Sequence, residues 1–381
     1  MTYLFETEEH AAIRAMVRRF AQTHIAPHGA QWEEDEEFPV ELYKTAATAG
    51  IQGIGYPEAI GGQGGDLGHV LVAQDEMVIA GRSVGTTVGL GTHGIALPPI
   101  VRFGTPEQQQ RFVVPCLRDG KISALGITEP GGGSDVAGLR TTAARDGDHY
   151  VINGAKTFIT SGTRADFVTT AVRTGGEGHG GVSLVVIERG TPGFGVSKKL
   201  KKTGWWASDT AELHFDNCRV PITNRIGPEH GAFPMIMMNF AAERLALAGQ
   251  CVAIAELAYR ESVSYARDRS AFGKPIMGFQ ITRHKLADMA TRIAAARALT
   301  NETTVRALRN DPLVAGLAAK AKNSATDMCS FVCDAAVQIH GGYGYMRETL
   351  VERLYRDARL YPIGGGTREI MNEVIAKTEG Y

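Results

Sequence analysis

The chain has 381 residues, of which 44% are hydrophobic and 21% are charged, and its formal net charge at pH 7 is −1. A chain of this length suits two or three packed regions rather than one small core. The near-neutral charge lacks the basic excess that nucleic-acid binding requires, so we expect no nucleic-acid partner. No apolar run long enough to cross a membrane is free of charged residues, which predicts no membrane span.

The first ten residues, MTYLFETEEH, are acidic and lead directly into a helical pattern. They have neither the basic start and apolar stretch of a signal peptide nor the Arg- and Ser-rich composition of a transit peptide. We therefore expect a cytoplasmic protein. The five cysteines are odd in number and scattered, which argues against a disulfide framework. Cys329 and Cys333 stand four apart and are expected to be buried in helix packing rather than to bind a metal.

Residues 1–120 have the pattern of helices joined by Gly-rich loops. Thr7 can cap a helix through Phe20, and Thr105 can cap another whose first turn holds Pro106. These positions predict an N-terminal α-helical domain.

Residues 121–229 change to the two-residue period of strands. Asp146-Gly147 and Asn153-Gly154 are hairpin-turn signals between apolar and β-branched residues. Further strands are predicted at residues 167–172, 182–187 and 211–220. This region is expected to be a β domain inserted between helical regions.

Residues 230–381 return to long helices, with segments at 232–257, 280–309 and 312–340. Across residues 232–257 the only charged side chains are Glu243, Arg244 and Glu256. A helix that is apolar on all sides is buried on most of its faces. The chain order is therefore helical, then β, then helical.

Glu243 is the most unusual residue of this apolar helix. An ionised carboxylate in an apolar interior costs several kcal/mol unless it is paired or its pKa rises. Arg244 is adjacent but points about 100° away around the helix, so it is a poor direct partner. From the pattern alone, two interpretations stay open: an ion pair with a basic residue on a neighbouring helix, or a catalytic carboxylate.

Each Gly-rich segment is weak evidence when taken alone, but eight ordered segments together resemble acyl-CoA dehydrogenases. The segments are YPEAIGGQGGD, ALGITEPGGGSDVAGLRT, YVINGAKTFITSG, TAELHFDNCRVP, ERLALAG, YARDRSAFGKPI, QIHGGYGYMRE and IGGGTREIMNEVIAK. The resemblance implies an α+β fold of that family: a helical domain at residues 1–120, a β-barrel or sandwich domain at 121–229 and a four-helix bundle at 230–381. The chain is most similar to the long-chain and isovaleryl-type branch.

The resemblance implies FAD as the cofactor. Positions in ITEPGGGSD and KTFITSG match groups that lie against the flavin ring, and RDRSAFGKPI matches a segment that reaches the FAD of a neighbouring subunit. Positions in QIHGGYGY and GGGTREI match further FAD contacts. The FAD-binding residues so implied are Ile127, Thr128, Gly133, Ser134, Phe158, Thr160, Arg269, Phe272, Gln338, Gly341, Gly342, Thr367 and Glu369. An arginine suits the pyrophosphate because its planar fork of donors pairs with phosphate oxygens.

The resemblance also implies where the catalytic base lies. Many family members carry a glutamate at the position of Gly365, which has no side chain. In the long-chain and isovaleryl-type branch the base comes instead from the helix that carries Glu-Arg, here Glu243 and Arg244. The implied roles are Glu243 as base, the Gly365 backbone N–H as donor to the thioester carbonyl, and Ser134 and Arg244 as substrate contacts.

The implied reaction is the α,β-dehydrogenation of an acyl-CoA thioester, with hydride transfer to flavin N5. The implied partners are an electron-transferring flavoprotein and further copies of the chain in a homotetramer. Two alternatives are an acyl-CoA oxidase that uses O2 and a non-catalytic flavoprotein of the same fold. The small residues of segment 81–100 fit either a roomy acyl pocket or close helix packing, and the acyl chain is not specified.

Overall fold

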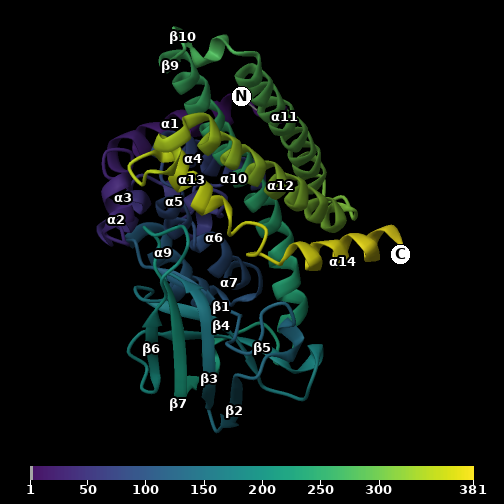
Figure 1. Cartoon of the computed structure of the whole chain (residues 1–381). Coiled ribbons are helices and arrows are strands. Elements are labelled where there is room, and N and C mark those ends of the chain that lie inside the picture. The colour runs from purple at the N-terminus through teal and green to yellow at the C-terminus, as the bar shows by residue number, and fades with distance from the viewer. Residues whose placement is uncertain (1–2) are drawn as a thin grey trace.

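The computed structural model describes residues 3–381, and its order of elements is helices, then strands, then helices (Figure 1). The predicted α+β class is therefore confirmed. The N-terminal helices are α1 (Glu8–His24), α2 (Gly29–Glu34), α3 (Glu41–Thr48), α4 (Leu67–Gly81), α5 (Val84–Leu90), α6 (His93–Ala96), α7 (Pro98–Phe103), α8 (Pro106–Gln108) and α9 (Val114–Asp119).

Side-chain caps begin these helices where the sequence predicts them. Thr7 is the N-cap of α1, with its side chain and that of His10 forming a capping box. Thr105 is the N-cap of α8, and its hydroxyl accepts from the Gln108 N–H. Such caps satisfy backbone N–H groups that have no partner within the helix, so the start of each helix is fixed locally.

The middle region is one hydrogen-bonded sheet in the order β6-β7-β3-β2-β4-β5-β8, with β1 pairing in parallel with β4. Alternating buried and exposed residues along β7 place one side of that strand in the core. The strands are β1 (Ser123–Gly126), β2 (Thr142–Asp146), β3 (His149–Thr160), β4 (Phe167–Arg173), β5 (Val182–Glu188), β6 (Phe194–Lys199), β7 (Thr210–Pro221) and β8 (Arg225–Ile226).

One of the two predicted hairpin turns is present and the other is wrong. Asp146-Gly147 joins β2 to β3, with Asp146 opposite His149. Asn153-Gly154 instead lies inside β3, at an irregularity in the pairing with β7. Gly154 has φ +147°, and a β-carbon there would lie 2.7 Å from Thr141 Cα. The glycine is required by this close backbone approach at a bulge rather than by a turn.

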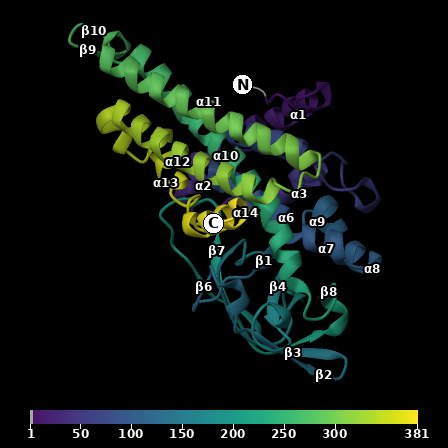
Figure 2. The same ribbon diagram turned by 90° about the vertical axis from the view of Figure 1, so that its right-hand side faces the viewer.

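The C-terminal region consists of long helices that pack side by side (Figure 2). α10 packs against α12, α11 and, from the N-terminal region, α4. A two-stranded hairpin of β9 (Ser270–Ala271) and β10 (Lys274–Pro275) follows α10. Among residues 3–381, no helix combines the length and the apolar character that a membrane crossing requires. The helices are α10 (Ala232–Asp268), α11 (Gln280–Leu308), α12 (Val314–His340), α13 (Leu350–Ala358) and α14 (Arg368–Glu379).

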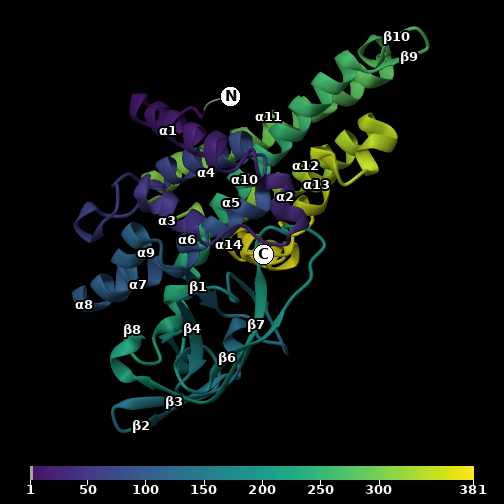
Figure 3. The same cartoon turned by 90° about the vertical axis from the view of Figure 1, so that its left-hand side faces the viewer.

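Helix α10 connects the two ends of the molecule. Its first turns pack against β5 and α7, and its later turns run through the helical core. The sheet lies at one end of the molecule and the β9–β10 hairpin at the opposite end (Figure 3). Any residue near the start of α10 is thus far from the hairpin that follows its end.

Candidate active site

The carboxyl group of Glu243 has no partner in the described part of the chain. The side chain is half-buried, its Oε2 atom is buried without a hydrogen bond, and no residue from 3 to 381 forms an ion pair with it. A structural ion pair within this chain therefore does not account for the position of Glu243. Burial raises the pKa of Glu243 to about 7, and the charges of Arg244 and Lys322 oppose that shift. A buried carboxylate that is poised near neutral pH and left unpaired is a candidate proton acceptor.

Gly365 lies directly beside this carboxyl group. A β-carbon built on Gly365 would stand 3.4 Å from Glu243 Oε1. The Gly365 N–H donates no hydrogen bond to any residue from 3 to 381. Two segments far apart in sequence therefore bring a free carboxylate and a free backbone donor to one place. A glutamate at position 365 would reach the same space from the opposite side.

Arg244 borders the same segment without pairing with Glu243. Its side chain is almost fully buried, and its Nη2 lies 3.8 Å from the β-carbon position of Gly366. Its guanidinium carbon stands 5.8 Å from the Phe240 ring centroid, an arrangement that stabilises a cation. Arg244 is consequently a fixed positive charge on one side of the candidate site.

Phe158 is held in an unusual conformation near the end of β3. Its φ is +61°, and 68% of its surface is exposed. The pairing of β3 with β7 shifts register between Lys156 and Ile159, so Phe158 sits in a bulge that turns its ring out of the strand. A bulky residue with positive φ costs free energy, which marks this exposed ring as a candidate binding surface.

The loop after β1 lies beside this bulge. Thr157 N–H donates to the Thr128 carbonyl at 2.9 Å, and the Lys156 ammonium donates to the Ile127 carbonyl at 3.0 Å and to Glu129 Oε1 at 2.8 Å. Burial lowers the pKa of Lys156 to about 8, with Glu129 opposing the shift. These bonds bring Ile127 and Thr128 next to the strand that carries Phe158.

The glycines and Ser134 that follow this loop are exposed. A β-carbon on Gly131 or Gly132 would have no atom within 4 Å, and a β-carbon on Gly133 would meet only the Thr128 side chain. Gly133 and Ser134 are open to solvent. Their backbone can approach a ligand closely because no side chain intervenes at the glycines.

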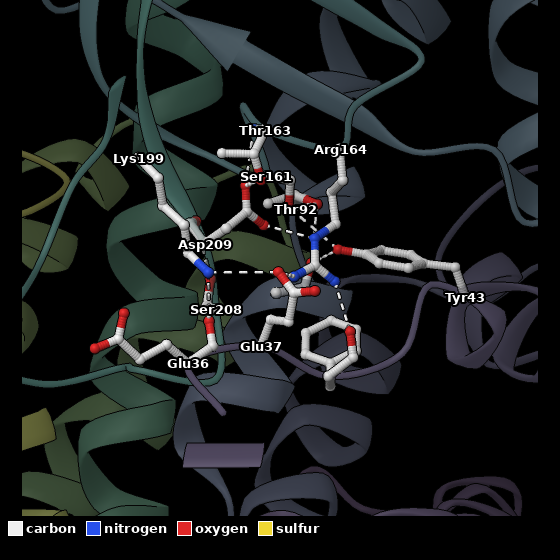
Figure 4. Close-up of polar contacts among 12 residues, drawn as sticks. Glu36, Glu37, Tyr43, Thr92, Ser161, Thr163, Arg164, Lys199, Ser208 and Asp209 are labelled. Atoms are coloured by element: carbon white, nitrogen blue, oxygen red, sulfur yellow. Dashed lines mark hydrogen bonds and ion pairs between the residues drawn. The ribbon is translucent and has the colours of Figure 1, made fainter. Parts of the chain in front are cut away.

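A buried ion pair anchors the chain immediately after Thr160 (Figure 4). Arg164 Nε donates to Asp209 Oδ1 at 2.7 Å, and both side chains are buried. Arg164 Nη1 also donates to the Phe38 carbonyl at 2.8 Å, and the guanidinium lies over the Phe38 ring. Thr163 N–H donates to Asp209 Oδ2 at 2.8 Å. The end of β3 is thereby tied to the N-terminal helices.

Hydroxyl groups of the N-terminal helical region also contact the end of β3 (Figure 4). Tyr43 Oη lies 3.1 Å from Ser161 Oγ and donates to the Gly89 carbonyl at 2.8 Å. Thr92 Oγ1 donates to the same carbonyl at 3.0 Å. Ser161 itself has φ +61°. The distorted backbone around Thr160 is therefore held by polar contacts from the helical region.

A second group of predicted residues gathers at the far end of α10. Phe272, on the β9–β10 hairpin, is 95% exposed with φ +50°, and Gln338 is exposed near the end of α12. Arg269, Gly341 and Gly342 line one hollow of about 580 Å³. The other residues that line this hollow are Tyr265, Ile276, Ile339, His340, Tyr343 and Met346.

One chain does not bring the two groups together. Arg269 stands 26 positions beyond Glu243, which corresponds to about 39 Å along a helix. Figure 3 shows the hairpin and the sheet at opposite ends. Thr367 caps α14, accepting from the Ile370 N–H at 3.3 Å, and Glu369 is exposed in the first turn. Only Thr367 and Glu369 of the predicted C-terminal contacts lie on the segment that follows Gly365.

Sequence patterns do not identify two buried lysines that lie beside the candidate site. Lys156 bonds to the loop of Ile127, and Lys322 bonds to the segment that carries Gly365. The sequence signal that could have indicated Lys322 is a lysine among the small and apolar residues at the start of α12. Lys320 gives the same signal, however, and it is partly exposed and pairs with Glu379. Only the packing of α12 distinguishes the two lysines.

One group of side chains in the described residues has atoms close enough to hold a metal ion: His10, Asp66 and His69. Both rings cap helices through Nδ1, which receives the backbone N–H of Thr7 or Asp66. The rings are stacked, with centroids 4.0 Å apart and planes 22° apart. The Nδ1 atom of each ring is therefore engaged in a helix cap, and we assign no metal to this group.

Comparison with known proteins covers almost the whole chain. Family models match residues 7–119 as "Acyl-CoA dehydrogenase, N-terminal domain", residues 124–218 as the middle domain and residues 231–379 as the C-terminal domain. The chain is 40% identical to an acyl-CoA dehydrogenase of Bacillus subtilis over 373 residues, covering 97% of this chain and 98% of the relative. It is 38% identical to the mitochondrial long-chain specific acyl-CoA dehydrogenase of Sus scrofa, covering 97% and 86%. A solved structure of a probable acyl-CoA dehydrogenase from Mycobacterium abscessus matches with a TM-score of 0.97 and 51% identity, covering 98% and 99%.

Proposed function

The chain belongs to the acyl-CoA dehydrogenase family, and from this premise we propose that it oxidises an acyl-CoA thioester to the trans-2-enoyl-CoA with FAD as cofactor. The observation that carries the assignment of the base is the unpaired, buried carboxyl group of Glu243 beside the free N–H of Gly365. The long-chain relative is among the most similar proteins, which agrees with the branch whose base lies on this helix.

The residues around Phe158 suit a flavin ring. An exposed aromatic side chain in a strained bulge, beside the backbone of Ile127 and Thr128 and the open glycines of the following loop, offers a flat apolar surface edged by hydrogen-bonding groups. We place Gly133, Ser134 and Thr160 in the same site. Bound FAD supplies the acceptor for the hydride that leaves Cβ.

The chain's own groups perform the proton transfer. Glu243 removes the α-proton, and its buried surroundings keep the carboxylate basic enough to do so near neutral pH. The thioester carbonyl develops negative charge as the proton leaves, and the Gly365 N–H donates to that oxygen. Arg244 adds a fixed positive charge near the same segment, and Ser134 contacts the thioester-bearing chain.

The second group of residues completes the cofactor site of another copy. Arg269 and Phe272 lie too far from Glu243 to share its site within one chain. We propose that Arg269 pairs with the FAD pyrophosphate bound mainly by a neighbouring subunit, together with Gln338, Gly341 and Gly342. Thr367 and Glu369 complete the FAD contacts. The assembly is a homotetramer, and an electron-transferring flavoprotein accepts the electrons.

Glu243→Gln tests the base. The purified flavoprotein is mixed anaerobically with an acyl-CoA, and the loss of flavin absorbance is followed. We expect the variant to keep its fold and FAD but to reduce flavin about 10²- to 10⁴-fold more slowly. Glu261→Gln is the matched control, since Glu261 is on the same helix and pairs with Arg82 away from the site. Wild-type rates in Glu243→Gln would overturn the assignment.

The same assay addresses the substrate and the electron acceptor. Asn239, one turn before Glu243, donates to the Ile95 carbonyl at 3.0 Å, so segment 81–100 packs on the part of α10 that carries the base. The rates of flavin reduction with a panel of acyl-CoAs, from short straight to long branched, therefore show which acyl chains fit beside this segment. Comparing O2 with electron-transferring flavoprotein as the oxidant of the reduced enzyme distinguishes the dehydrogenase from an acyl-CoA oxidase.

A further inference from the structure

Lys322 is a fully buried lysine on α12, and two backbone carbonyls receive its ammonium group. Lys322 Nζ donates to the Tyr361 carbonyl at 2.9 Å and to the Gly366 carbonyl at 2.8 Å. An ammonium group removed from water is costly unless hydrogen bonds or opposite charge compensate it. The two acceptors stand at the two ends of residues 361–366, so one side chain holds both ends of this short segment.

The start of segment 361–366 has further fixed points, because the buried Tyr361 hydroxyl donates to Gln250 Oε1 at 3.0 Å and the Arg368 N–H donates to the Pro362 carbonyl at 3.1 Å. The backbone N–H groups of Ile363 and Gly364 both donate to the Leu360 carbonyl, while those of Gly365 and Gly366 have no acceptor within residues 3–381. Gly365 has φ +65° and Gly366 φ +96°. Glycines are the most permissive residues of a backbone. Beyond the Gly364 N–H, the bond from Lys322 to the Gly366 carbonyl is the one hydrogen bond among residues 3–381 that holds this end of the segment, so the orientation of the Gly365 N–H depends on it.

The same lysine borders the carboxyl group of Glu243. At the point where a β-carbon on Gly365 would lie, Glu243 Oε1 is 3.4 Å away and Lys322 Cε is 3.6 Å away. The charged groups that face Glu243 are Arg244 from its own helix and Lys322 from α12. A nearby positive charge favours the ionised carboxylate and opposes the effect of burial.

Lys322 is itself affected by this environment. Burial lowers the pKa of Lys322 to about 8, with Arg244 adding to the shift and Cys251 and Glu243 opposing it. The lysine is thus cationic at neutral pH. It can act on Glu243 only while it keeps that charge.

We propose that Lys322 is a positioning residue of the reaction: its ammonium group holds segment 361–366 so that the Gly365 N–H faces the thioester carbonyl, and its charge favours the ionised form of Glu243. The inference rests on the function proposed above. A purely structural lysine would hold the segment but would leave the titration of Glu243 unchanged. The two roles are therefore separable by experiment.

The test compares Lys322→Met, which removes both charge and donors, with Lys322→Gln, which keeps N–H donors but no charge. Lys320→Met is the matched control, because Lys320 lies two positions away on α12 and pairs with Glu379 at the surface. The holoenzyme is titrated by infrared spectroscopy, and the Glu243 carboxyl band is isolated by subtracting the spectrum of the Glu243→Gln variant made in each background. Anaerobic flavin reduction is measured over the same pH range.

We expect the carboxyl midpoint to rise by about one unit in both Lys322 variants and to stay unchanged in Lys320→Met. The rate of flavin reduction below the midpoint then falls about tenfold. If Lys322→Met does not fold, Lys322→Gln carries the test. An unchanged carboxyl midpoint overturns the inference, whatever the melting temperature does. Absence of flavin reduction in the wild type with every acyl-CoA overturns the proposed function instead, and the infrared result is unaffected by it.

Discussion

Moving the base from position 243 to position 365 tests the geometry of the site directly. In a Glu243→Gln background, Gly365→Glu returns a carboxylate from the opposite side. A β-carbon at 365 would lie 3.4 Å from the old Oε1 and only 2.4 Å from Leu247 Cδ1. The contact with Leu247 is to the tip of a flexible side chain, so rotation or Leu247→Ala relieves it. The φ of +65° at position 365 costs a non-glycine residue about 1–2 kcal/mol.

These magnitudes predict a folded but weakened enzyme. A loss of about 1–3 kcal/mol in unfolding free energy leaves a chain of this size folded. Since a general base contributes about 10²- to 10⁴-fold, we expect the relocated base to recover at least about tenfold over Glu243→Gln, and more when Leu247→Ala is added.

The assay is anaerobic flavin reduction at a saturating acyl-CoA concentration, with flavin content and melting temperature measured on each variant. Gly364→Glu in the same background is the control, because a β-carbon at Gly364 would meet only Leu360 at 3.8 Å and not the Glu243 carboxyl group. A double variant that folds, binds FAD and is no faster than Glu243→Gln would show that a carboxylate at position 365 does not reach the α-proton. Equal rescue by Gly364→Glu would show that the gain does not depend on position 365.

Four further predictions follow from the same structure. The rate of flavin reduction should rise with pH through a midpoint near 7, because only ionised Glu243 accepts a proton and burial raises its pKa to about 7; a midpoint below 5 contradicts this. The pKa of Glu243 is higher in the folded than in the unfolded chain, so protonated Glu243 stabilises the fold at low pH and this stabilisation is lost as the pH rises through about 7. The wild-type melting temperature should therefore fall relative to that of Glu243→Gln between pH 5 and 8. Phe158→Gly relieves a φ of +61° and should stabilise the apoprotein by about 1 kcal/mol while lowering flavin retention; denaturant unfolding and the flavin-to-protein absorbance ratio measure both, and undiminished flavin content speaks against the ring contact. Arg164→Met leaves the buried Asp209 carboxylate without its cation and should cost about 3 kcal/mol of unfolding free energy; Asp209→Asn in that background should recover part of the loss, and a loss below about 1 kcal/mol shows that the pair is dispensable.

Periodicity predicts the helices and most strands because each is stabilised by its own pattern of burial. The long apolar run that begins at Ala232 becomes α10, and the alternation at residues 211–220 becomes β7. Asn153-Gly154 misleads because the same dipeptide chemistry serves a hairpin turn and a bulge. The difference lies in how closely Thr141 approaches Gly154, a contact that no local pattern encodes.

The site is only partly predictable for the same reason. A carboxylate in an apolar helix identifies Glu243 as exceptional, but its proximity to Gly365 joins two segments that no local rule connects. The roles of Phe158 and Arg269 come from resemblance to a family. Lys322 escapes both routes, since its importance depends on which face of α12 is buried and on the carbonyls that it meets there.

Helix α10 determines the distance between Glu243 and Arg269. Its 37 residues run unbroken to Asp268, and Arg269 follows directly as the C-cap, so the helix fixes the distance between Glu243 and Arg269 and their angular offset about one axis. Inserting one residue between them would turn the far end by about 100° and advance it by about 1.5 Å. Inserting seven residues would restore the angle to within about 20° but would increase the distance between Glu243 and Arg269 by about 10 Å. This stretch should therefore accept changes of side chain far more readily than any change of length.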